Sequence, residues 1–300
     1  MPFSWSQTKG TASDVEVVVL GITQDAGFPQ ADCQKACCAN LLKEQVQDHH
    51  VSCLGVIDHR SRQMWLLDAT PDFTHQLHTL QSFSRSAIPY DLAGIIITHA
   101  HIGHYTGLMY LGREAMDAQN VNVFCLPRMK TFLESNGPWS QLVTLGNIQL
   151  FPIQAEATIQ LTEQVALSTI LVPHRDEFSE TAGIVVSSKS GKALFIPDID
   201  KWEKWDRDIN DFIRDVDMAF LDGTFYENGE LPNRDMSEIP HPFVEESMSL
   251  FQDLSDIERK KIHFIHLNHT NPLLDPNSEA SEKVLKKGYK VAREGMILGL

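Results

Sequence analysis

The feature that most constrains this 300-residue chain is an apolar run, residues 95–97, that leads directly into three histidines. The run is short and β-branched, which predicts a buried strand. His99 and His101 lie two residues apart, so on extended backbone their side chains point the same way and can share one centre. His104 comes about one turn later, where we expect a helix to begin, and can face a neighbouring centre. Because converging neutral imidazoles are transition-metal ligands, we prefer this interpretation to three unrelated surface histidines in a loop.

Composition narrows the class of protein and its partners. Hydrophobic residues make up 42% of the chain and charged residues 22%, which is typical of a globular protein with a sizeable core. The formal net charge of −15 argues against nucleic-acid binding, which needs clustered Lys and Arg. No apolar run approaches the length of a membrane span, and residues 1–14 lack the apolar core of a signal sequence.

We therefore expect a cytoplasmic protein that acts on a small-molecule substrate, with no nucleic-acid partner and no membrane partner. A signal sequence removed before residue 1 is compatible with the same sequence. The oligomeric state does not follow from these observations, and a homodimer is the candidate that we retain.

Three of the five cysteines, Cys33, Cys37 and Cys38, lie within six residues. The total of five is odd, and three of the five are clustered. Both facts disfavour a disulfide framework and favour thiolate ligation in a reducing compartment. Three thiolates lack one ligand for a closed tetrahedral zinc site, so a fourth ligand must come from far along the chain. Cys53 and Cys125 each lie in an apolar stretch, and we expect both to be small buried hydrophobic residues.

Strand and helix patterns alternate along the chain. Strands are predicted at residues 15–20, 51–57, 64–67, 121–125, 165–172, 181–187, 193–196, 218–221 and 262–267, and helices at 72–81, 106–118, 127–135, 206–217 and 242–254. Residues 142–145 and 148–153 flank Gly146 and Asn147, where we expect a hairpin. The strands come in two batches, each interleaved with helices, which favours two sheets sandwiched between helices. Without a repeat or a low-complexity linker, residues 1–300 are interpreted as one domain.

Metal-competent side chains follow strand after strand. They are Asp68, the three histidines named above, His174, Asp198, Asp222, His266 and His269. Catalytic groups collect at such positions because rigid strands hold the loops that follow them. Asp68 also precedes a predicted helix, so it could cap that helix, orient a metal-binding histidine, or do both.

The segment THAHIGH, residues 98–104, resembles the HxHxDH signature of the metallo-β-lactamase superfamily. Asp68, His174, Asp198 and His266 follow the order of that superfamily's other motifs. Four further segments resemble the pyrroloquinoline quinone (PQQ) synthesis protein B branch, to which the phosphonate-pathway phosphodiesterases are related. These segments are residues 24–30 with the cysteine cluster, 195–200, 222–225 and 266–272. The resemblance covers nearly the whole chain and implies an α/β fold, the four-layer αββα sandwich, with a metal site at one edge.

The resemblance also implies a set of ligands. One metal site would be formed by His99, His101 and His174, and a second by His104 and His266, with Asp198 bridging the two. A structural zinc would be held by Cys33, Cys37, Cys38 and His269. Asp68 and Asp222 would support the ligands from behind. His241 matches a substrate-facing histidine of the related phosphodiesterases; the alternative is a solvent-exposed loop histidine.

Two departures from the family pattern bear on function. Gly103 stands where the superfamily has an aspartate, and glycine supplies no oxygen. The second site is therefore expected to contain two imidazoles and one shared carboxylate, and to bind its ion more weakly. Conversely, the PQQ branch usually has an eroded histidine motif, whereas His99, His101 and His104 are all present here. This difference favours a relative with another substrate.

We expect metal-assisted hydrolysis of an ester or phosphodiester-type bond, with one or two Zn²⁺, Fe or Mn ions at the active site and one structural Zn²⁺. The metal would lower the pKa of a coordinated water to about 7. Asp198 would act as general base and His241 would protonate the leaving group. The first alternative is Fe(II)/O2-dependent oxidation or hydroxylation in PQQ-type cofactor biosynthesis. The second is a non-catalytic metal-binding protein. A nuclease for transfer RNA precursors shares the motifs, but the acidic balance counts against it.

Overall fold

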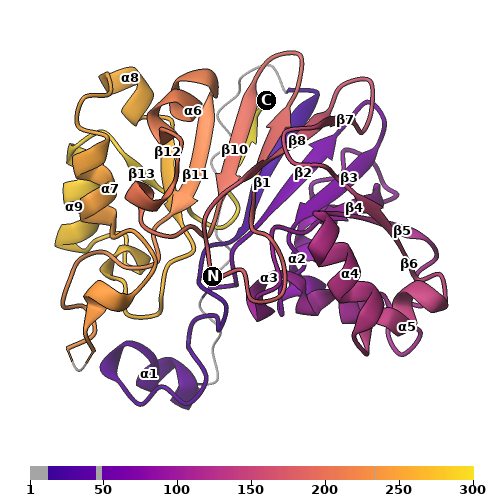
Figure 1. Cartoon of the computed structure of the whole chain (residues 1–300), viewed down its shortest axis with the longest axis horizontal. Helices are drawn as coiled ribbons and strands as arrows, with labels where there is room; N and C mark the ends of the chain where they lie inside the picture. The colour runs from indigo at the N-terminus through magenta and orange to yellow at the C-terminus, as the bar shows by residue number, and fades with distance from the viewer. Residues whose placement is uncertain (1–12, 45–48, 233) are drawn as a thin grey trace.

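A computed structural model describes residues 13–44, 49–232 and 234–300 of the chain. Within these residues, two mixed sheets of seven strands each pack face to face, and helices cover their outer faces (Figure 1). The predicted αββα sandwich is confirmed. No helix in this part of the chain combines the length and the apolar character needed to cross a bilayer.

The first sheet has the strand order β14-β1-β2-β3-β4-β5-β6. Its strands are β1 (Val15–Gly21), β2 (Cys53–Asp58), β3 (Gln63–Leu67), β4 (Asp91–Ile96), β5 (Val121–Cys125), β6 (Ile148–Pro152) and β14 (Ile297–Gly299). Strands β3 to β6 run parallel, so their carboxyl ends meet at one edge of the sheet. The outer face packs against α2 (Phe73–Ser82), α3 (Ile102–Tyr105), the 3-10 helix η1 (Thr106–Leu111), α4 (Pro127–Ser135) and α5 (Trp139–Thr144).

The second sheet has the strand order β13-β12-β11-β10-β9-β8-β7. Its strands are β7 (Thr158–Gln160), β8 (Ala166–Leu171), β9 (Ala182–Ser187), β10 (Lys192–Ile196), β11 (Met218–Asp222), β12 (Ile262–Ile265) and β13 (Lys290–Val291). Strands β10 to β13 are parallel. Nearby helices are α6 (Ile209–Asp215), α7 (Val244–Leu250), α8 (Asp256–Arg259) and α9 (Glu279–Lys286), with the 3-10 helices η2 (Trp202–Lys204), η3 (Met236–Glu238) and η4 (Pro272–Leu274). Helix α1 (Ala36–Glu44) lies apart, at the lower end of Figure 1.

The central strands are apolar on both faces because both faces are covered. In β1, Val17 and Val19 belong to the apolar cluster between the sheets, whereas Val18 and Leu20 pack in the cluster beneath the first sheet's helices. This two-sided burial fixes the strands firmly in place. Their carboxyl ends are therefore rigid points from which side chains can be positioned.

Two local predictions are wrong. The expected hairpin at residues 142–153 is absent, because residues 139–144 form α5 and β6 pairs in parallel with β5. Gly146 has a φ of +73° and reverses the chain after a helix rather than between two strands. The helix expected at 106–118 is only the 3-10 helix η1, which ends where Gly112 takes up extended backbone.

Candidate metal centre

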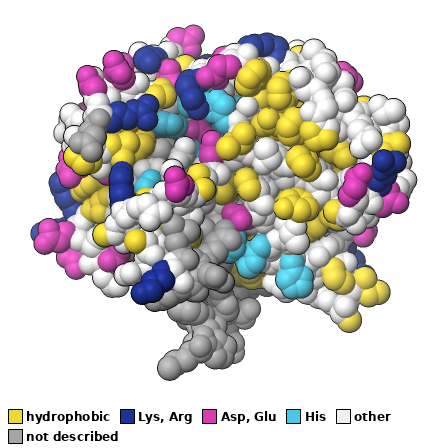
Figure 2. Space-filling model, turned by 90° about the horizontal axis from the view of Figure 1, so that it is seen from below, with side chains coloured by type: hydrophobic (Ala, Val, Ile, Leu, Met, Phe, Trp, Pro, Cys, Tyr) yellow, Lys and Arg dark blue, Asp and Glu magenta, His cyan; other side chains and the backbone are white. Residues whose placement is uncertain are grey.

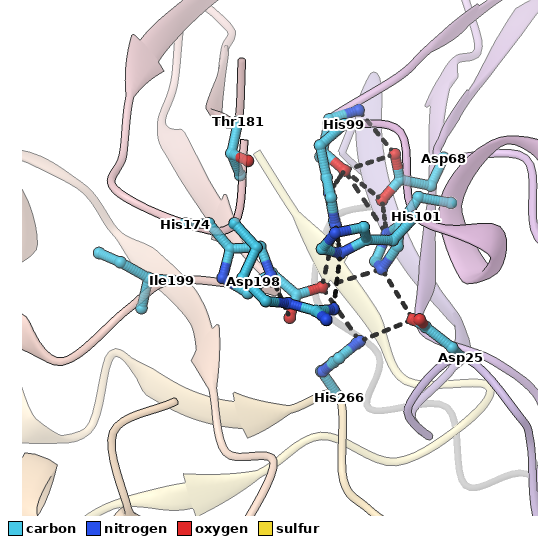
Figure 3. A network of polar contacts seen from close by, with 12 residues as sticks. Asp25, Asp68, His99, His101, His174, Thr181, Asp198, Ile199 and His266 are labelled. Carbon is cyan, nitrogen blue, oxygen red and sulfur yellow. Dashed lines mark hydrogen bonds and ion pairs between the residues drawn. The ribbon is translucent and has the colours of Figure 1, made fainter. Parts of the chain in front are cut away.

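The carboxyl ends of parallel strands from both sheets meet at one edge of the molecule, and metal-competent side chains project from them (Figure 3). Asp68 follows β3, His99 follows β4, Asp198 follows β10, Asp222 ends β11 and His266 follows β12. Residues separated by more than 160 positions in the sequence are thus brought into contact. Seen from below, histidine side chains reach the surface on this side of the molecule, beside a hydrophobic area (Figure 2).

The first group of candidate ligands consists of His99, His101 and His174. One nitrogen from each lies within 4.8 Å of the others. Asp198 borders this group: its Oδ2 lies 3.6 Å from Nε2 of His99, and its Oδ1 lies 3.7 Å from Nε2 of His174. His99 is fully buried and His101 is half-buried, so solvent reaches the group from the His101 side.

The second group contains His104 and His266, and it shares Asp198 with the first. Oδ2 of Asp198 lies 2.9 Å from Nε2 of His104 and 3.2 Å from Nε2 of His266. A second carboxylate, that of Asp25, also lies here: its Oδ1 is 3.2 Å from Nε2 of His104 and 3.5 Å from Nε2 of His266. The expectation of only one carboxylate at this position is therefore wrong. Asp25 lies in a loop that carries no metal-ligand spacing, so its place in the sequence does not predict this role.

The donor atoms of both groups fit a divalent cation. Among the described residues, several buried polar atoms at this point have no hydrogen-bond partner: Nε2 of His104, both ring nitrogens of His174, Nε2 of His266, Oδ2 of Asp198 and Oδ1 of Asp25. Buried polar atoms are normally paired. A metal ion is a partner that satisfies imidazole nitrogens and carboxylate oxygens together.

Behind the ligands of the first sheet, Asp68, Thr98 and His99 form a chain of hydrogen bonds that we call the first-sheet relay. Oδ1 of Asp68 accepts hydrogen bonds from the Thr98 backbone N–H (2.8 Å) and hydroxyl (2.9 Å). The hydroxyl oxygen of Thr98 in turn accepts from Nδ1 of His99 at 3.0 Å. The other carboxylate oxygen of Asp68 accepts from Nδ1 of His104 at 2.7 Å. These bonds place the ring protons on Nδ1 and leave Nε2 free to ligate.

The second sheet repeats this arrangement in Asp222, Thr224 and His266, which we call the second-sheet relay. Oδ1 of Asp222 accepts from the Thr224 backbone N–H (2.9 Å) and hydroxyl (2.7 Å). The hydroxyl oxygen of Thr224 accepts from Nδ1 of His266 at 2.9 Å. The other oxygen of Asp222 accepts from Nδ1 of His241 at 2.7 Å.

His241 is buried and faces both His174 and Asp198, so the alternative of a solvent-exposed loop histidine is wrong. Its Nδ1 also lies 3.4 Å from Oδ1 of Asp198. Because the Nδ1 proton is committed to Asp222, that nitrogen has no lone pair to give a metal. We therefore do not count His174, Asp198 and His241 as a third site, although they lie close together.

Burial and charge act on the ligands in opposite directions. Burial, and then the neighbouring His104, lowers the pKa of His99 well below its usual value, so its ring is neutral and able to ligate. Burial also lowers the pKa of His104, but the surrounding carboxylates, Asp68 first, outweigh burial and hold that pKa well above its usual value. Burial raises the pKa of Asp198, but the nearby imidazoles, His266 first, hold it well below its usual range. The second group thus favours positive charge at its centre.

The cysteine cluster forms a separate site with His269. Nδ1 of His269 lies 3.6 Å from the Sγ of Cys33 and 3.5 Å from the Sγ atoms of Cys37 and Cys38, and the sulfurs of Cys33 and Cys37 are 3.9 Å apart. Metal–sulfur and metal–nitrogen bonds of about 2.3 and 2.0 Å in a tetrahedron require edges of roughly 3.5 to 3.8 Å. The four donors therefore fit one zinc ion. Cys53 and Cys125 do not belong to this cluster; both are buried, as predicted from the apolar stretches in which they lie.

Comparison with known proteins agrees with this geometry. A family model described as "Beta-lactamase superfamily domain" matches residues 64–267. The chain is 25% identical over 311 residues to coenzyme PQQ synthesis protein B of Klebsiella pneumoniae, covering 95% of this chain and 98% of the relative. It is 26% identical over 312 residues to the protein of the same name from Pseudomonas protegens, covering 95% and 99%.

Two solved structures share the fold. Zn²⁺-bound PqqB from Methylobacterium extorquens matches with a TM-score of 0.79 at 19% identity, over 95% of this chain and all (100%) of the other. A diphosphatase from the PhnP family matches with a TM-score of 0.64 at 18% identity, over 95% and 96% of the two chains. At these identities the structural matches establish the architecture alone.

Proposed function

This chain belongs to the beta-lactamase superfamily and is similar to its PQQ synthesis protein B branch, and from that premise we propose that it is a metal-dependent hydrolase. The observation that carries the proposal is the convergence of buried imidazole nitrogens and carboxylate oxygens that have no hydrogen-bond partner among the described residues. The bond that we propose is broken is of the ester or phosphodiester type, in a small-molecule substrate.

The two groups divide the binding of metal between them. His99, His101 and His174 would hold one ion, His104 and His266 a second, and Asp198 lies between the two. A bound divalent ion lowers the pKa of water to about 7 and polarises the carbonyl or phosphoryl oxygen of the substrate. Both Zn²⁺ and Fe or Mn suit this donor set.

The side chains of the protein would handle the protons. Asp198 is buried between the two groups and, as an ionised carboxylate, would accept a hydrogen bond from the attacking water and orient it. Asp222 holds Nδ1 of His241, which fixes the ring and leaves its Nε2 to exchange a proton with the leaving group. His101 is half-buried and contacts Glu177. Ile102 and Phe178, which follow these two residues in the sequence, have exposed side chains. We therefore propose that the substrate enters on the His101 side of the centre.

A second candidate function is oxidation or hydroxylation with Fe(II) and O2 during assembly of a PQQ-type cofactor. The observation that favours it is the similarity to PQQ synthesis protein B over 95% of the chain. Imidazoles with a carboxylate and open positions suit non-haem iron as well as zinc. A third candidate, a non-catalytic protein with only the cysteine-bound zinc, leaves the buried polar atoms of the histidine groups unpaired.

Elemental analysis and turnover assays of the protein purified without added metal test the proposal. We expect zinc or manganese beyond the cysteine site, together with turnover of a chromogenic phosphodiester or ester. His99→Ala should lower turnover by at least about a hundredfold. His78→Ala, the same substitution at an exposed position on α2, should leave it unchanged. Full turnover by His99→Ala would remove the proposal, and iron with oxygen consumption would favour oxidation.

A further inference from the structure

We propose that Asp25 supplies the carboxylate ligand that Gly103 cannot, so that the second metal site is complete but takes its carboxylate from a different part of the chain. This inference rests on the proposed function, because it assigns a ligand within the same metal centre. It concerns the one position at which the THAHIGH segment departs from the superfamily signature. Three observations carry it: the place of Asp25, the space around Gly103, and the backbone that joins Asp25 to His266.

The carboxylate of Asp25 points into the second group. Its Oδ1 lies within 3.5 Å of Nε2 of both His104 and His266, and this oxygen is buried without a hydrogen-bond partner among the described residues (Figure 3). Nε2 of His104 and Nε2 of His266 are unpaired in the same way. Because the Nδ1 protons of both histidines are committed to Asp68 and Thr224, each ring turns its Nε2 toward Asp25, and Nε2 is the atom at which a metal ion can replace a proton. The carboxylate oxygen and the two Nε2 atoms therefore surround a point where positive charge is favoured, and a divalent ion at this point would bind all three.

The side chain of Asp25 occupies the space in which a side chain at position 103 would lie, so only glycine fits at position 103. A Cβ atom at position 103 would lie 2.4 Å from Oδ1, 2.8 Å from Cγ and 2.7 Å from Cα of Asp25. Real Cβ atoms do not approach other heavy atoms this closely, so a side chain at 103 and the carboxylate of Asp25 exclude each other. Gly103 has no positive φ that would explain the glycine on backbone grounds. The two positions therefore offer alternative routes by which a carboxylate reaches one point.

Backbone pairing with the second sheet holds Asp25 in place. The Leu267 backbone N–H donates to the Ile22 carbonyl at 2.7 Å, and the Gln24 N–H donates to the Leu267 carbonyl at 2.9 Å. Asp25 directly follows this pairing and His266 directly precedes Leu267, so the two side chains emerge next to each other. A turn closed by the Gly27 N–H and the Gln24 carbonyl, at 2.8 Å, fixes the far side of Asp25.

The second site therefore has two imidazoles, from His104 and His266, and two carboxylates, from Asp25 and Asp198. Asp198 is shared with the first group, so Asp25 contributes the one carboxylate that belongs to the second site alone. The weaker binding expected from the sequence thus does not follow, because the oxygen missing at position 103 is restored from position 25.

Asp25→Asn tests the assignment, because the amide keeps the size of the side chain and removes its charge. The matched control is Asp253→Asn, the same substitution at an exposed position. Metal content is measured by elemental analysis after dialysis, and the affinity for the second ion by competition of Zn²⁺ with a chromophoric chelator. We expect Asp25→Asn to weaken the second ion roughly tenfold to a hundredfold or more while the first ion and the cysteine-bound zinc remain.

The wild-type protein separates the two ways in which this experiment could fail. A wild-type protein that binds no ion beyond the cysteine site would overturn the proposed function. A wild-type protein that binds two further ions, with unchanged affinity in Asp25→Asn, would overturn only the role of Asp25.

An exchange of the two residues tests whether they serve the same point. Gly103→Asp alone should displace the Asp25 loop and weaken the second ion. Asp25→Gly combined with Gly103→Asp removes the obstructing side chain and lets the loop shift. We expect this double variant to bind the second ion more tightly than Asp25→Gly or Gly103→Asp alone. A double variant no better than either single variant would overturn the exchange.

Discussion

Each of the two sheets contributes the same Asp–Thr–His chain of hydrogen bonds to the candidate metal centre, but the aspartate of each chain binds a second histidine with a different proposed role. In the first-sheet relay, Asp68 holds Thr98, which holds His99; in the second-sheet relay, Asp222 holds Thr224, which holds His266. Both carboxylates are fully buried, and the second oxygen of each also faces the ring of a further histidine. That oxygen binds His104 in the first sheet and His241 in the second. We propose that His104 uses its Nε2 to bind a metal ion, whereas His241 serves proton transfer. On this proposal, the same hydrogen-bond pattern supports metal binding in one sheet and proton transfer in the other.

Strain is distributed unequally between the two sheets. Asp68 has a φ of 72° and His266 a φ of 64°, the left-handed region that costs a non-glycine residue of the order of 1 kcal/mol or more. In the first sheet the strained residue is therefore the supporting carboxylate, Asp68, and in the second it is the candidate ligand, His266. Such strain persists only where the surroundings enforce it, which is consistent with a preformed centre.

The largest difference between the sheets is expected from the same substitution at the two carboxylates. In Asp68→Asn, the amide oxygen can still accept from Thr98, so the NH2 group faces Nδ1 of His104. The ring must then accept at Nδ1 and carry its proton on Nε2, where it cannot ligate. We expect the second ion to be lost and the affinity of the first to fall, measured by elemental analysis and chelator competition. Wild-type metal content in this variant would contradict the role given to the first-sheet relay.

Asp222→Asn should separate metal content from turnover. Its amide oxygen can keep the bonds from Thr224, so His266 stays in place, while the NH2 group forces His241 into the wrong tautomer. We expect both ions to remain and kcat to fall by about a hundredfold. Metal content and kcat are measured on the same preparation. If Asp222→Asn lost metal to the same extent as Asp68→Asn, the two sheets would be equivalent and the comparison would fail.

The smallest effects are expected at the two threonines. Thr98→Val and Thr224→Val keep the shape of each side chain and remove the hydroxyl that receives the histidine Nδ1 proton. Each should weaken one ion by about tenfold. Thr98→Val should act on the ion at His99 and Thr224→Val on the ion at His266, so titrations that resolve the two ions should show opposite patterns. Both variants acting on the same ion would contradict the division of the centre into two groups.

Much of this centre could be predicted from local sequence because the strands are buried on both faces. A wholly apolar strand that stops at a charged or imidazole side chain marks its own end, and Asp68, His99 and Asp222 stand at such ends. The threonines of the relays carry no such signal, because threonine is common at strand ends and its role depends on which side chains lie across from it.

Asp25 and the region around Gly146 could not be predicted for a different reason. Asp25 does not stand directly at the end of an apolar strand, so no local pattern marks it. Its position is fixed by the backbone pairing of Ile22 and Gln24 with Leu267, which lies more than 200 residues away. Gly146, with its positive φ, fits a hairpin turn as well as the turn that ends α5, and only the parallel pairing of β6 with β5 decides between them. In both cases a contact distant in sequence determines the local structure.

Anomalous X-ray diffraction from crystals of the wild-type protein, grown with Zn²⁺ and recorded on both sides of the zinc edge, tests the central claim most directly. The account predicts three peaks: one among Cys33, Cys37, Cys38 and His269, one among His99, His101 and His174, and one among Asp25, His104 and His266. Asp198 should lie between the last two. A single peak at the cysteines, with no anomalous density between the histidine side chains, would contradict the account.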